Sequence, residues 1–174
     1  SFENYATLTA EARRMLLAEL VRKWAAAEQV RTATGAPLVA NSPAAALALA
    51  DDLARLIDDM ATRRVPWERL DELVDEEADW LAASGERFAL LADNGLGWAI
   101  ADLALHRQML PSVPLPGFFT PGQIRHALDD AGIDGLLTDD PSRMRDLLPG
   151  WRTAGVSGRT GLALFCRQLD ASTR

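Results

Sequence analysis

Cysteine is almost absent from this 174-residue chain: Cys166 stands alone, and there are only two histidines. A lone cysteine excludes an intramolecular disulfide and a cysteine-based zinc site, which needs several thiolates. His106 and His126 lie on different predicted helices and show no His-Glu-x-x-His spacing, so they do not form a metal site. We therefore expect no metal ion, and we expect a cytoplasmic protein.

Long hydrophobic runs are also missing. Hydrophobic residues make up 48% of the chain, which is enough for a core. No run reaches the roughly 18 apolar residues that a transmembrane helix needs. Residues 1–4 do not begin a basic and apolar signal sequence. The sequence thus predicts no association with a membrane.

Lysine is scarce, because Lys23 is the only lysine among 18 basic residues. The net charge is −7, and residues 1–85 hold 15 acidic but only 9 basic side chains. Binding to a nucleic-acid backbone needs a surface rich in lysine and arginine. We therefore expect no nucleic-acid partner.

The first half of the chain predicts helices. Thr9 is a candidate N-cap, and Ser42-Pro43 is a strong start signal, because proline at the first helical position loses no hydrogen bond. A loop is expected at 32–41, and Pro66 begins a third helix that stops near Gly85. Each helix is expected to have one apolar face. In the first helix this face consists of Met15, Leu16, Leu20 and Trp24, widened by Leu17 and Val21. In the second it consists of Ala46, Leu49, Ala50, Leu53, Ile57 and Met60, and in the third of Leu70, Leu73, Val74, Trp80 and Leu81.

Short apolar runs alternate with helical patterns in the second half. Strands are predicted at 88–92, 112–116 and 135–138, with helices after Gly95 and after Thr120. This order is typical of a parallel sheet with crossover helices. The helices carry apolar residues at helical spacing, namely Leu96, Ala99, Ile100, Leu103 and Ala104, then Ile124, Ala127, Leu128 and Ala131.

Four residues at the centres of these elements are expected to be buried, because a parallel sheet is covered on both faces. They are Leu90 and Leu137 in the two outer strands, and Ile100 and Leu128 in the crossover helices. After the third strand, Asp140-Pro141 caps a short helix with Met144, Leu147 and Leu148. A loop at 155–161 and a fourth strand at 162–165 follow.

The predicted fold class is therefore α/β. A helical segment of about three helices, 1–65, precedes a small parallel βαβαβ unit within residues 66–174.

The second half resembles a known family. The segment "FALLADNGLGWAIADLALHRQMLPSVPLPGFFTPGQIRHALDDAGIDGLLTDD" is similar to the early N-terminal region of AMP-dependent acyl-activating (adenylate-forming) enzymes. In that family a strand ending in Asp-Asn precedes a helix with Trp and Ala-Asp-Leu-Ala, and a Val-Pro-Leu segment, a helix and a strand follow. The resemblance covers residues 66–174.

This resemblance implies a parent activity, the ATP-dependent activation of a carboxylic acid through an acyl-adenylate. The ATP and acyl chemistry of the family lies almost wholly downstream of the matching region. The chain is therefore expected to be a non-catalytic module or fragment, without the phosphate loop and the later catalytic lysine. Its expected partner is the remainder of a larger synthetase domain.

The N-terminal third resembles a different class. "LTAEARRMLLAELVRKW", "ANSPAAALALADDLARLIDDM" and "VPWERLDELV", within residues 8–74, are similar to AddB-type subunits of bacterial double-strand-break repair complexes. This resemblance implies an alternative, a scaffold-like piece of a DNA repair subunit. A hybrid sequence without an evolved function is a third alternative, because the two resemblances meet inside one helix, near residues 67–70.

One loop is a candidate phosphate site. In acyl-activating enzymes a Ser/Thr/Gly-rich loop ending in Pro-Lys lets backbone N–H groups approach phosphates. Here Arg159 replaces a small hydroxyl residue, and Leu162-Ala163 stand where Pro-Lys is needed. An ordinary glycine turn is the favoured interpretation. ATP is expected only if this loop binds it, and no catalytic residue is predicted. The weak candidates for cofactor binding are Ser157, Gly158, Thr160 and Gly161.

Two further features have structural interpretations. Asp93 or Asn94 is expected to cap the following helix, since the third glycine of a dinucleotide-binding loop is missing. Phe118-Phe119 is expected to form an exposed apolar rim that supports self-association. Adjacent aspartates at 51/52, 58/59, 129/130 and 139/140 are expected on solvated surfaces, because neighbouring helical residues point in different directions.

Overall fold

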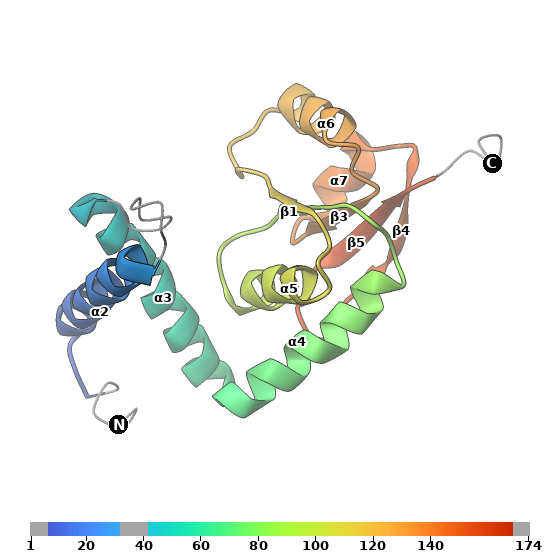
Figure 1. Ribbon diagram of the computed structural model, residues 1–174. Helices are drawn as coiled ribbons and strands as arrows, with labels where there is room; N and C mark the ends of the chain where they lie inside the picture. The colour runs from blue at the N-terminus through green and yellow to red at the C-terminus, as the bar shows by residue number, and fades with distance from the viewer. Residues whose placement is uncertain (1–6, 32–41, 169–174) are drawn as a thin grey trace. The chain divides into compact units, whose positions relative to one another are not determined.

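The computed structural model describes residues 7–31 and 42–168 (Figure 1). The chain forms two compact units, residues 1–63 and residues 64–174. The predicted loop at 32–41 lies outside the described residues. In the part of the chain that the structure describes, no helix combines the length and the apolar character needed to cross a bilayer.

The first unit contains helix α2 (Ala10–Arg31) and helix α3 (Pro43–Arg63). Both predicted start signals are confirmed. The Ala12 backbone N–H donates to Thr9 Oγ1 at 3.2 Å, and the Ala45 N–H donates to Ser42 Oγ at 3.1 Å. Each hydroxyl therefore satisfies one of the amide groups that a helix start leaves without an intrahelical partner.

The buried face of α2 agrees only in part with the predicted one, because Leu17 and Val21 are buried as expected and the rest of the predicted face is exposed. The residues that pack towards α3 are Leu17, Ala18, Val21 and Ala25, whereas Met15, Leu16, Leu20 and Trp24 are exposed. Alanines let the two helices approach closely, so the face with small residues makes the contact. On α3, Ala46, Ala50 and Met60 are buried as predicted, while Leu49, Leu53 and Ile57 are half-buried.

The second unit begins with the predicted third helix and continues as an α/β arrangement. Its elements are α4 (Trp67–Ala82), β1 (Phe88–Leu91), α5 (Leu96–Arg107), β2 (Ser112–Pro114), α6 (Pro121–Asp130), β3 (Gly135–Thr138), α7 (Pro141–Leu147), β4 (Trp151–Val156) and β5 (Ala163–Arg167). The five strands form one sheet in the order β2-β1-β3-β5-β4. The α/β fold class is confirmed.

The sheet is parallel over β2, β1 and β3, as the alternation predicts, and antiparallel over β5 and β4. The expectation that β1 and β3 are the outer strands is wrong, because β1 lies between β2 and β3. β2 is an edge strand of three residues, and Pro114, which has no N–H, fits an edge position. Strand β4 was not predicted. It is an exposed edge strand with a bulge between Thr153 and Gly155, so it has no apolar alternation.

Helices cover both faces of the sheet. Figure 1 shows α6 and α7 on one side, with α5 and α4 on the other. The strand order explains this arrangement. The chain crosses the sheet in one direction from β1 to β2 and in the opposite direction from β2 to β3, so two right-handed crossovers place α5 and α6 on opposite faces. The core on the α6 and α7 side consists of Ala89, Leu91, Leu115, Ile124, Leu128, Ile133, Leu136, Met144, Leu147, Leu148, Ala163 and Phe165.

The four burial predictions for this unit are confirmed, because Leu90, Ile100, Leu128 and Leu137 are each no more than 1% exposed. One member of the predicted α5 stripe, Leu103, is 45% exposed. The buried face of α5 instead runs through Leu96, Ile100, Ala101, Ala104 and Leu105.

Helix starts in this unit are partly as predicted. Thr120 forms a capping box with Gln123, and Asp140 accepts from the Arg143 N–H at 3.1 Å. At α5, however, the N-cap is Gly95 and makes no side-chain cap, so the expectation of Asp93 or Asn94 is wrong. The Asp93 N–H instead donates to Asp139 Oδ2 at 2.8 Å, which ties the end of β1 to the end of β3.

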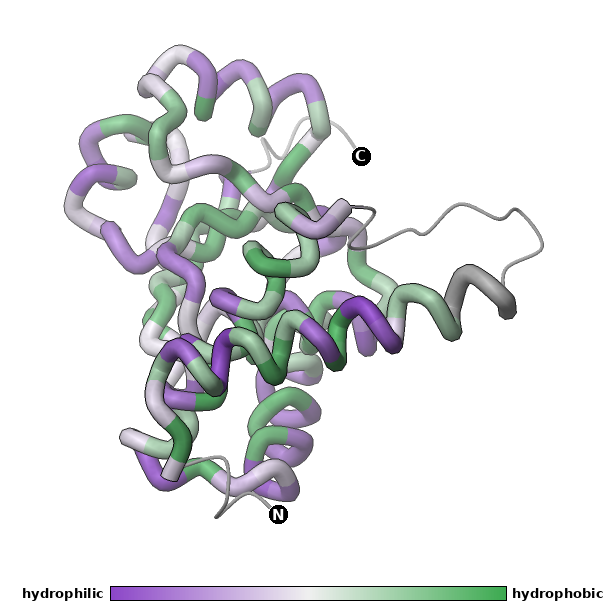
Figure 2. The backbone as a smooth tube through the Cα atoms, turned by 90° about the vertical axis from the view of Figure 1, so that its left-hand side faces the viewer, coloured by the Kyte–Doolittle hydropathy of each residue, from purple (hydrophilic) through white to green (hydrophobic). Residues whose placement is uncertain are grey.

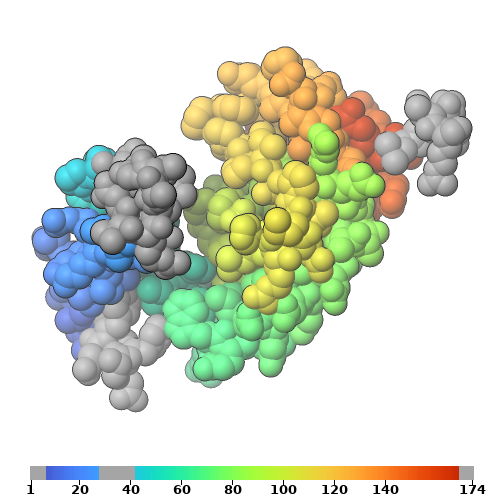
Figure 3. Space-filling view, in the orientation of Figure 1, coloured from blue at the N-terminus to red at the C-terminus, as the bar shows by residue number. Residues whose placement is uncertain are grey.

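The segment after α5, yellow in Figure 3, lies at the surface of this unit. Phe118 is 85% exposed, in line with the predicted apolar rim. Phe119 is half-buried and packs on the core beneath α6 and α7, with its ring edge-on to that of Phe118 at 5.7 Å. The rim therefore consists of one exposed ring supported by a second.

Candidate functional site

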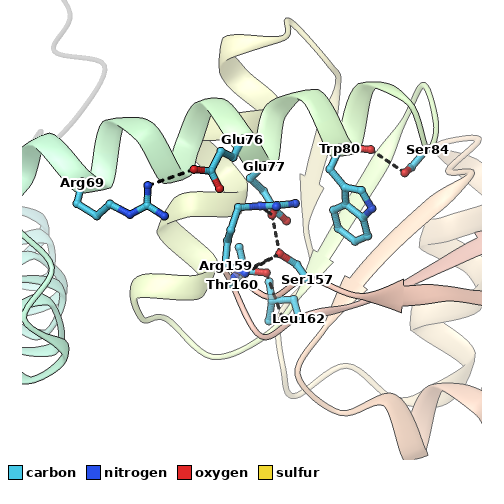
Figure 4. A network of polar contacts seen from close by, with 9 residues as sticks. All are labelled: Arg69, Glu76, Glu77, Trp80, Ser84, Ser157, Arg159, Thr160 and Leu162. Atoms are coloured by element: carbon cyan, nitrogen blue, oxygen red, sulfur yellow. Dashed lines mark hydrogen bonds and ion pairs between the residues drawn. The ribbon is translucent and has the colours of Figure 1, made fainter.

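The predicted phosphate loop joins the antiparallel strands β4 and β5. Ser157 and Thr160 are buried, whereas Gly158 and Gly161 are exposed. The loop is drawn in Figure 4, where it faces the helix α4. Four weak candidates from the sequence thus lie in one turn, but the two hydroxyl side chains among them point into the protein and not to solvent.

Three backbone N–H groups of this loop donate to Ser157, which is itself part of the loop. Ser157 Oγ accepts from the Arg159 N–H at 3.2 Å and from the Thr160 N–H at 3.3 Å. The Gly161 N–H donates to the Ser157 carbonyl at 2.8 Å. A phosphate cradle needs backbone N–H groups that converge on open space. Three successive N–H groups of this loop converge on Ser157.

A buried carboxylate anchors the loop, and Figure 4 shows it between the loop and α4. Glu77 is 0% exposed. Ser157 Oγ donates to Glu77 Oε2 at 2.6 Å, and Arg159 Nε donates to the same oxygen at 2.7 Å. Hydrogen bonds to an ionised acceptor are stronger than neutral ones. Glu77 therefore fixes both the serine at the start of the loop and the arginine in its middle.

Glu77 was not singled out from the sequence, although a signal was present. The buried apolar residues of α4 are Leu70, Val74, Ala78 and Leu81, and position 77 falls on the same face at steps of three and four from Leu70, Val74 and Leu81. The residue was hidden in an acidic run, where neighbouring Glu76 is exposed and pairs with Arg69 at 3.1 Å. A carboxylate in a predicted apolar stripe is the pattern that identifies such an anchor.

The charges at this site do not favour an anion. A bound phosphate would lie beside the buried carboxylate of Glu77, whose Oε1 has no hydrogen-bond partner. Arg159 is the only cation of the loop, and the ion pair with Glu77 already engages it. Its guanidinium also lies 5.9 Å from the centre of the Trp80 ring. The cation of the loop is thus directed at α4.

A glycine on α5 completes the packing. An added Cβ at Gly97 would lie 2.2 Å from the Thr160 carbonyl oxygen, so only glycine fits there without a backbone shift. The second glycine of the Asp-Asn-Gly-Leu-Gly segment therefore serves a close approach between a helix and the loop 157–161. Loop 157–161, Glu77 and Gly97 together are called the loop clamp below.

A surface groove lies between α4 and α5, with a volume of about 300 Å³. Arg107 donates to Asp71 at 2.8 Å and also pairs with Asp75 across this groove. These two aspartates raise the pKa of Arg107, with Asp71 making the larger contribution. The lining consists of Trp67, Leu70, Asp71, Val74, Leu103, His106 and Arg107.

The other titratable candidates do not gather into a site. His106 and His126 are exposed. No group of three or more His, Cys, Asp or Glu side chains in the described ranges is arranged to hold a metal ion. Cys166 is buried in β5, where burial raises the pKa of its thiol, and Sγ donates to the Ser84 carbonyl at 3.7 Å. Burial also raises the pKa of Asp102 on α5.

Comparison with known proteins gives one match. Residues 38–163 match the sequence model of the family described as AMP-binding enzyme. This range takes in α3 and α4, and it ends at the first residue of β5. No curated protein and no solved structure matches the chain. The resemblance of residues 8–74 to AddB-type subunits stays a prediction.

Proposed function

Because the chain belongs to the AMP-binding enzyme family, we propose that it provides a non-catalytic α/β module of a cytoplasmic ATP-dependent carboxylic-acid ligase. In this proposal the module does not form an acyl-adenylate by itself and binds no cofactor. The partner it requires is the remainder of a larger synthetase domain. Its own contribution is a sheet whose two faces are covered by helices.

The loop clamp carries this proposal. A loop that binds the phosphates of ATP must offer N–H groups and positive charge to the ligand. In loop 157–161 the N–H groups of Arg159, Thr160 and Gly161 donate to Ser157. The Arg159 side chain binds Glu77. Binding a phosphate there would require breaking several hydrogen bonds and placing the anion beside a buried carboxylate. Two negative charges placed together away from water repel each other strongly, so phosphate binding at this position is unfavourable.

Pyrophosphate exchange tests the proposal directly. The purified chain is incubated with MgATP, labelled pyrophosphate and a panel of carboxylic acids, and an acyl-activating enzyme is assayed in parallel as the positive control. We expect exchange at background with every acid. Exchange that depends on an added acid would overturn the proposal.

Calorimetric titration with MgATP tests the loop itself. We expect no binding heat for the parent chain. We expect none for Ser157→Ala either, a variant that loses the three hydrogen bonds of Ser157 Oγ, to Glu77 and to the N–H groups of Arg159 and Thr160. Binding by the parent chain that disappears in Arg159→Ala would identify the loop as a phosphate site. Circular dichroism of each variant shows whether the fold is retained, so that a loss of binding is not a loss of structure.

A further inference from the structure

Helix α2 has two apolar faces, and among the described residues of its unit one of them packs on α3. Leu17, Val21 and neighbouring alanines pack towards α3. On another side of the helix, Leu16, Leu20 and Trp24 are 41%, 51% and 50% exposed. Their spacing of four residues places them in one row, which is called the α2 outer stripe here. In Figure 2 hydrophobic and hydrophilic residues alternate around α2, the helix that runs into the long grey trace.

Such a row differs from ordinary surface hydrophobicity. Single exposed apolar residues are normal, as at Met109 and Phe118, but a contiguous row marks an interaction surface. Exposed faces of helices are otherwise polar. Tryptophan and leucine in line also suit the knobs-into-holes contacts by which helices pair. The α2 outer stripe therefore has the chemistry of one half of a helix–helix interface.

We propose that the α2 outer stripe binds the same stripe of a second copy of this chain, with the two helices antiparallel. The twofold axis passes beside Leu20. Leu20 then packs against Leu20 of the other copy, and Leu16 packs against Trp24 in both directions. An interface of this kind is self-complementary and closes as a dimer. The inference does not depend on the proposed function.

Charges beside the stripe select the antiparallel orientation. Glu19 and Lys23 lie on one flank of the stripe and form an ion pair of 2.8 Å within the helix. The ion pair lowers the pKa of Glu19. In an antiparallel pair, Glu19 of one copy lies near Lys23 of the other, so two further attractions form. In a parallel pair, the twofold axis would place this flank on opposite sides of the interface in the two copies, so Glu19 of one copy would not meet Lys23 of the other.

Arg13, near the other flank, does not oppose this arrangement. Its guanidinium pairs with Asp58 of α3 at 2.5 Å, and its side chain is only 23% exposed. The charge is thus turned towards α3 and away from the stripe. The central contact is apolar, while the attractive charges are confined to the rim, which is the usual anatomy of an interface.

Sedimentation equilibrium over a range of concentrations tests the dimer. We expect a mass approaching twice 18.9 kDa for the parent chain as concentration rises. Leu20→Glu should weaken association at least tenfold, because it places two carboxylates at the axis. Phe118→Glu, at the 85% exposed ring of the second unit, is the matched control and should leave association unchanged. Circular dichroism confirms that both variants keep their helices.

Charge exchange tests the pairing of the rims. Lys23→Glu should weaken the dimer, because Glu19 of one copy then meets a carboxylate of the other. Adding Glu19→Lys should restore association, since the double variant has both attractions in reversed order. A double variant that associates no better than Lys23→Glu would contradict the proposed pairing.

Cysteine cross-linking tests the orientation. In the proposed dimer, positions 20 face each other across the axis, so Leu20→Cys should form a disulfide-linked dimer under mild oxidation. The two copies of position 16 are separated by eight residues along the helix axis, about 12 Å, too far for a disulfide. Leu16→Cys should therefore stay unlinked, and so should the parent chain with its buried Cys166. A parent chain that is monomeric at every concentration, or equal linking of both variants, would overturn the proposal.

Discussion

The two units of the chain use apolar residues in different ways. In residues 64–174, a five-stranded sheet between two helical layers encloses large side chains, and Phe88, Phe165, Leu137 and Met144 are each no more than 1% exposed. In residues 1–63, two helices bury mainly small residues, such as Ala18, Ala25, Ala46 and Ala50. A pair of helices has only one contact face, whereas a covered sheet has two. The first unit therefore leaves large apolar residues at its surface.

This difference has an energetic consequence. Burial of apolar area stabilises by about 25 cal/mol per Å², so large enclosed side chains contribute more than alanines. Ion pairs such as Arg14–Asp51, 2.5 Å, accompany the contact between α2 and α3. Exposed pairs of this kind contribute only about 0–1 kcal/mol. We therefore expect the second unit to be the more stable one.

The largest expected effect is a core truncation in the sheet. Leu137→Ala should lower the free energy of unfolding by roughly 2–5 kcal/mol, because it leaves a cavity between β3 and its covering helices. Chemical denaturation followed by tryptophan fluorescence measures this. Leu17→Ala in α2 is the matched truncation and should cost less than the lower end of that range, since its site is near the surface. Equal costs would remove the distinction between the two units.

The next effect concerns the buried carboxylate of the loop clamp. Glu77→Ala should cost about 1.5–3 kcal/mol, the usual contribution of hydrogen bonds to a charged group, because Ser157 and Arg159 lose their acceptor. Glu76→Ala, one position away and exposed, should change stability by less than about 1 kcal/mol. Both are measured by urea denaturation. If Glu77→Ala proved as mild as Glu76→Ala, the clamp would not hold the loop.

A somewhat smaller effect is expected from overpacking in the same clamp. Gly97→Ala should cost about 1–3 kcal/mol, because the new Cβ meets the Thr160 carbonyl and the backbone must shift. Gly122→Ala is the control, since no atom lies within 4 Å of its added Cβ. That variant should be neutral or slightly stabilising. Thermal unfolding of the two variants measures this difference. A loss of stability in Gly97→Ala alone indicates the close contact with Thr160, whereas an equal loss in both variants would show only that alanine is poorly tolerated at either glycine.

The smallest effect should depend on pH. Burial raises the pKa of Asp102 above its usual value of 3.8, an effect that the charge of His106 opposes. The folded state thus holds the proton more tightly than the unfolded state. The contribution of Asp102 to stability is full below pH 3.8 and is lost as pH rises through its folded pKa. Asp102→Asn should gain stability relative to the parent between about pH 4 and pH 7. A difference that did not change with pH would contradict this assignment.

Much of the second unit follows from local patterns. The strands at 88–91 and 135–138 are short and mostly apolar. Thr120 and Asp140 are typical N-cap residues and mark the starts of α6 and α7. Strand β4 has no such pattern, because an exposed edge strand needs no apolar alternation. The apolar pattern also does not predict that β2 lies at the edge of the sheet and β1 inside it. That order depends on Pro114, which has no N–H and therefore suits an edge strand.

The candidate site shows the same division. The sequence identified loop 157–161 but could not show that Ser157 faces inward, because that depends on Glu77, 80 residues away in the chain. In α2, Leu16, Leu20 and Trp24 are larger and more hydrophobic than Ala18 and Ala25. The sequence therefore predicts that the face with the large residues is buried, whereas the face with the alanines is the buried one. Helix α3 selects the face that permits close approach, and this selection is a property of the pair of helices.

Hydrogen exchange of the full chain, followed by mass spectrometry in the low-micromolar range, tests the central claim most directly. That claim is that residues 64–174 form the stable unit and hold loop 157–161 closed. Amides of β1, β3 and β5 should exchange at least roughly a hundredfold more slowly than those of α2 and α3, and the amides of Arg159 and Thr160 should be protected with the strands. Exchange of α2 and α3 as slow as that of the strands, or exchange of the loop as fast as that of an unstructured peptide, would contradict the account.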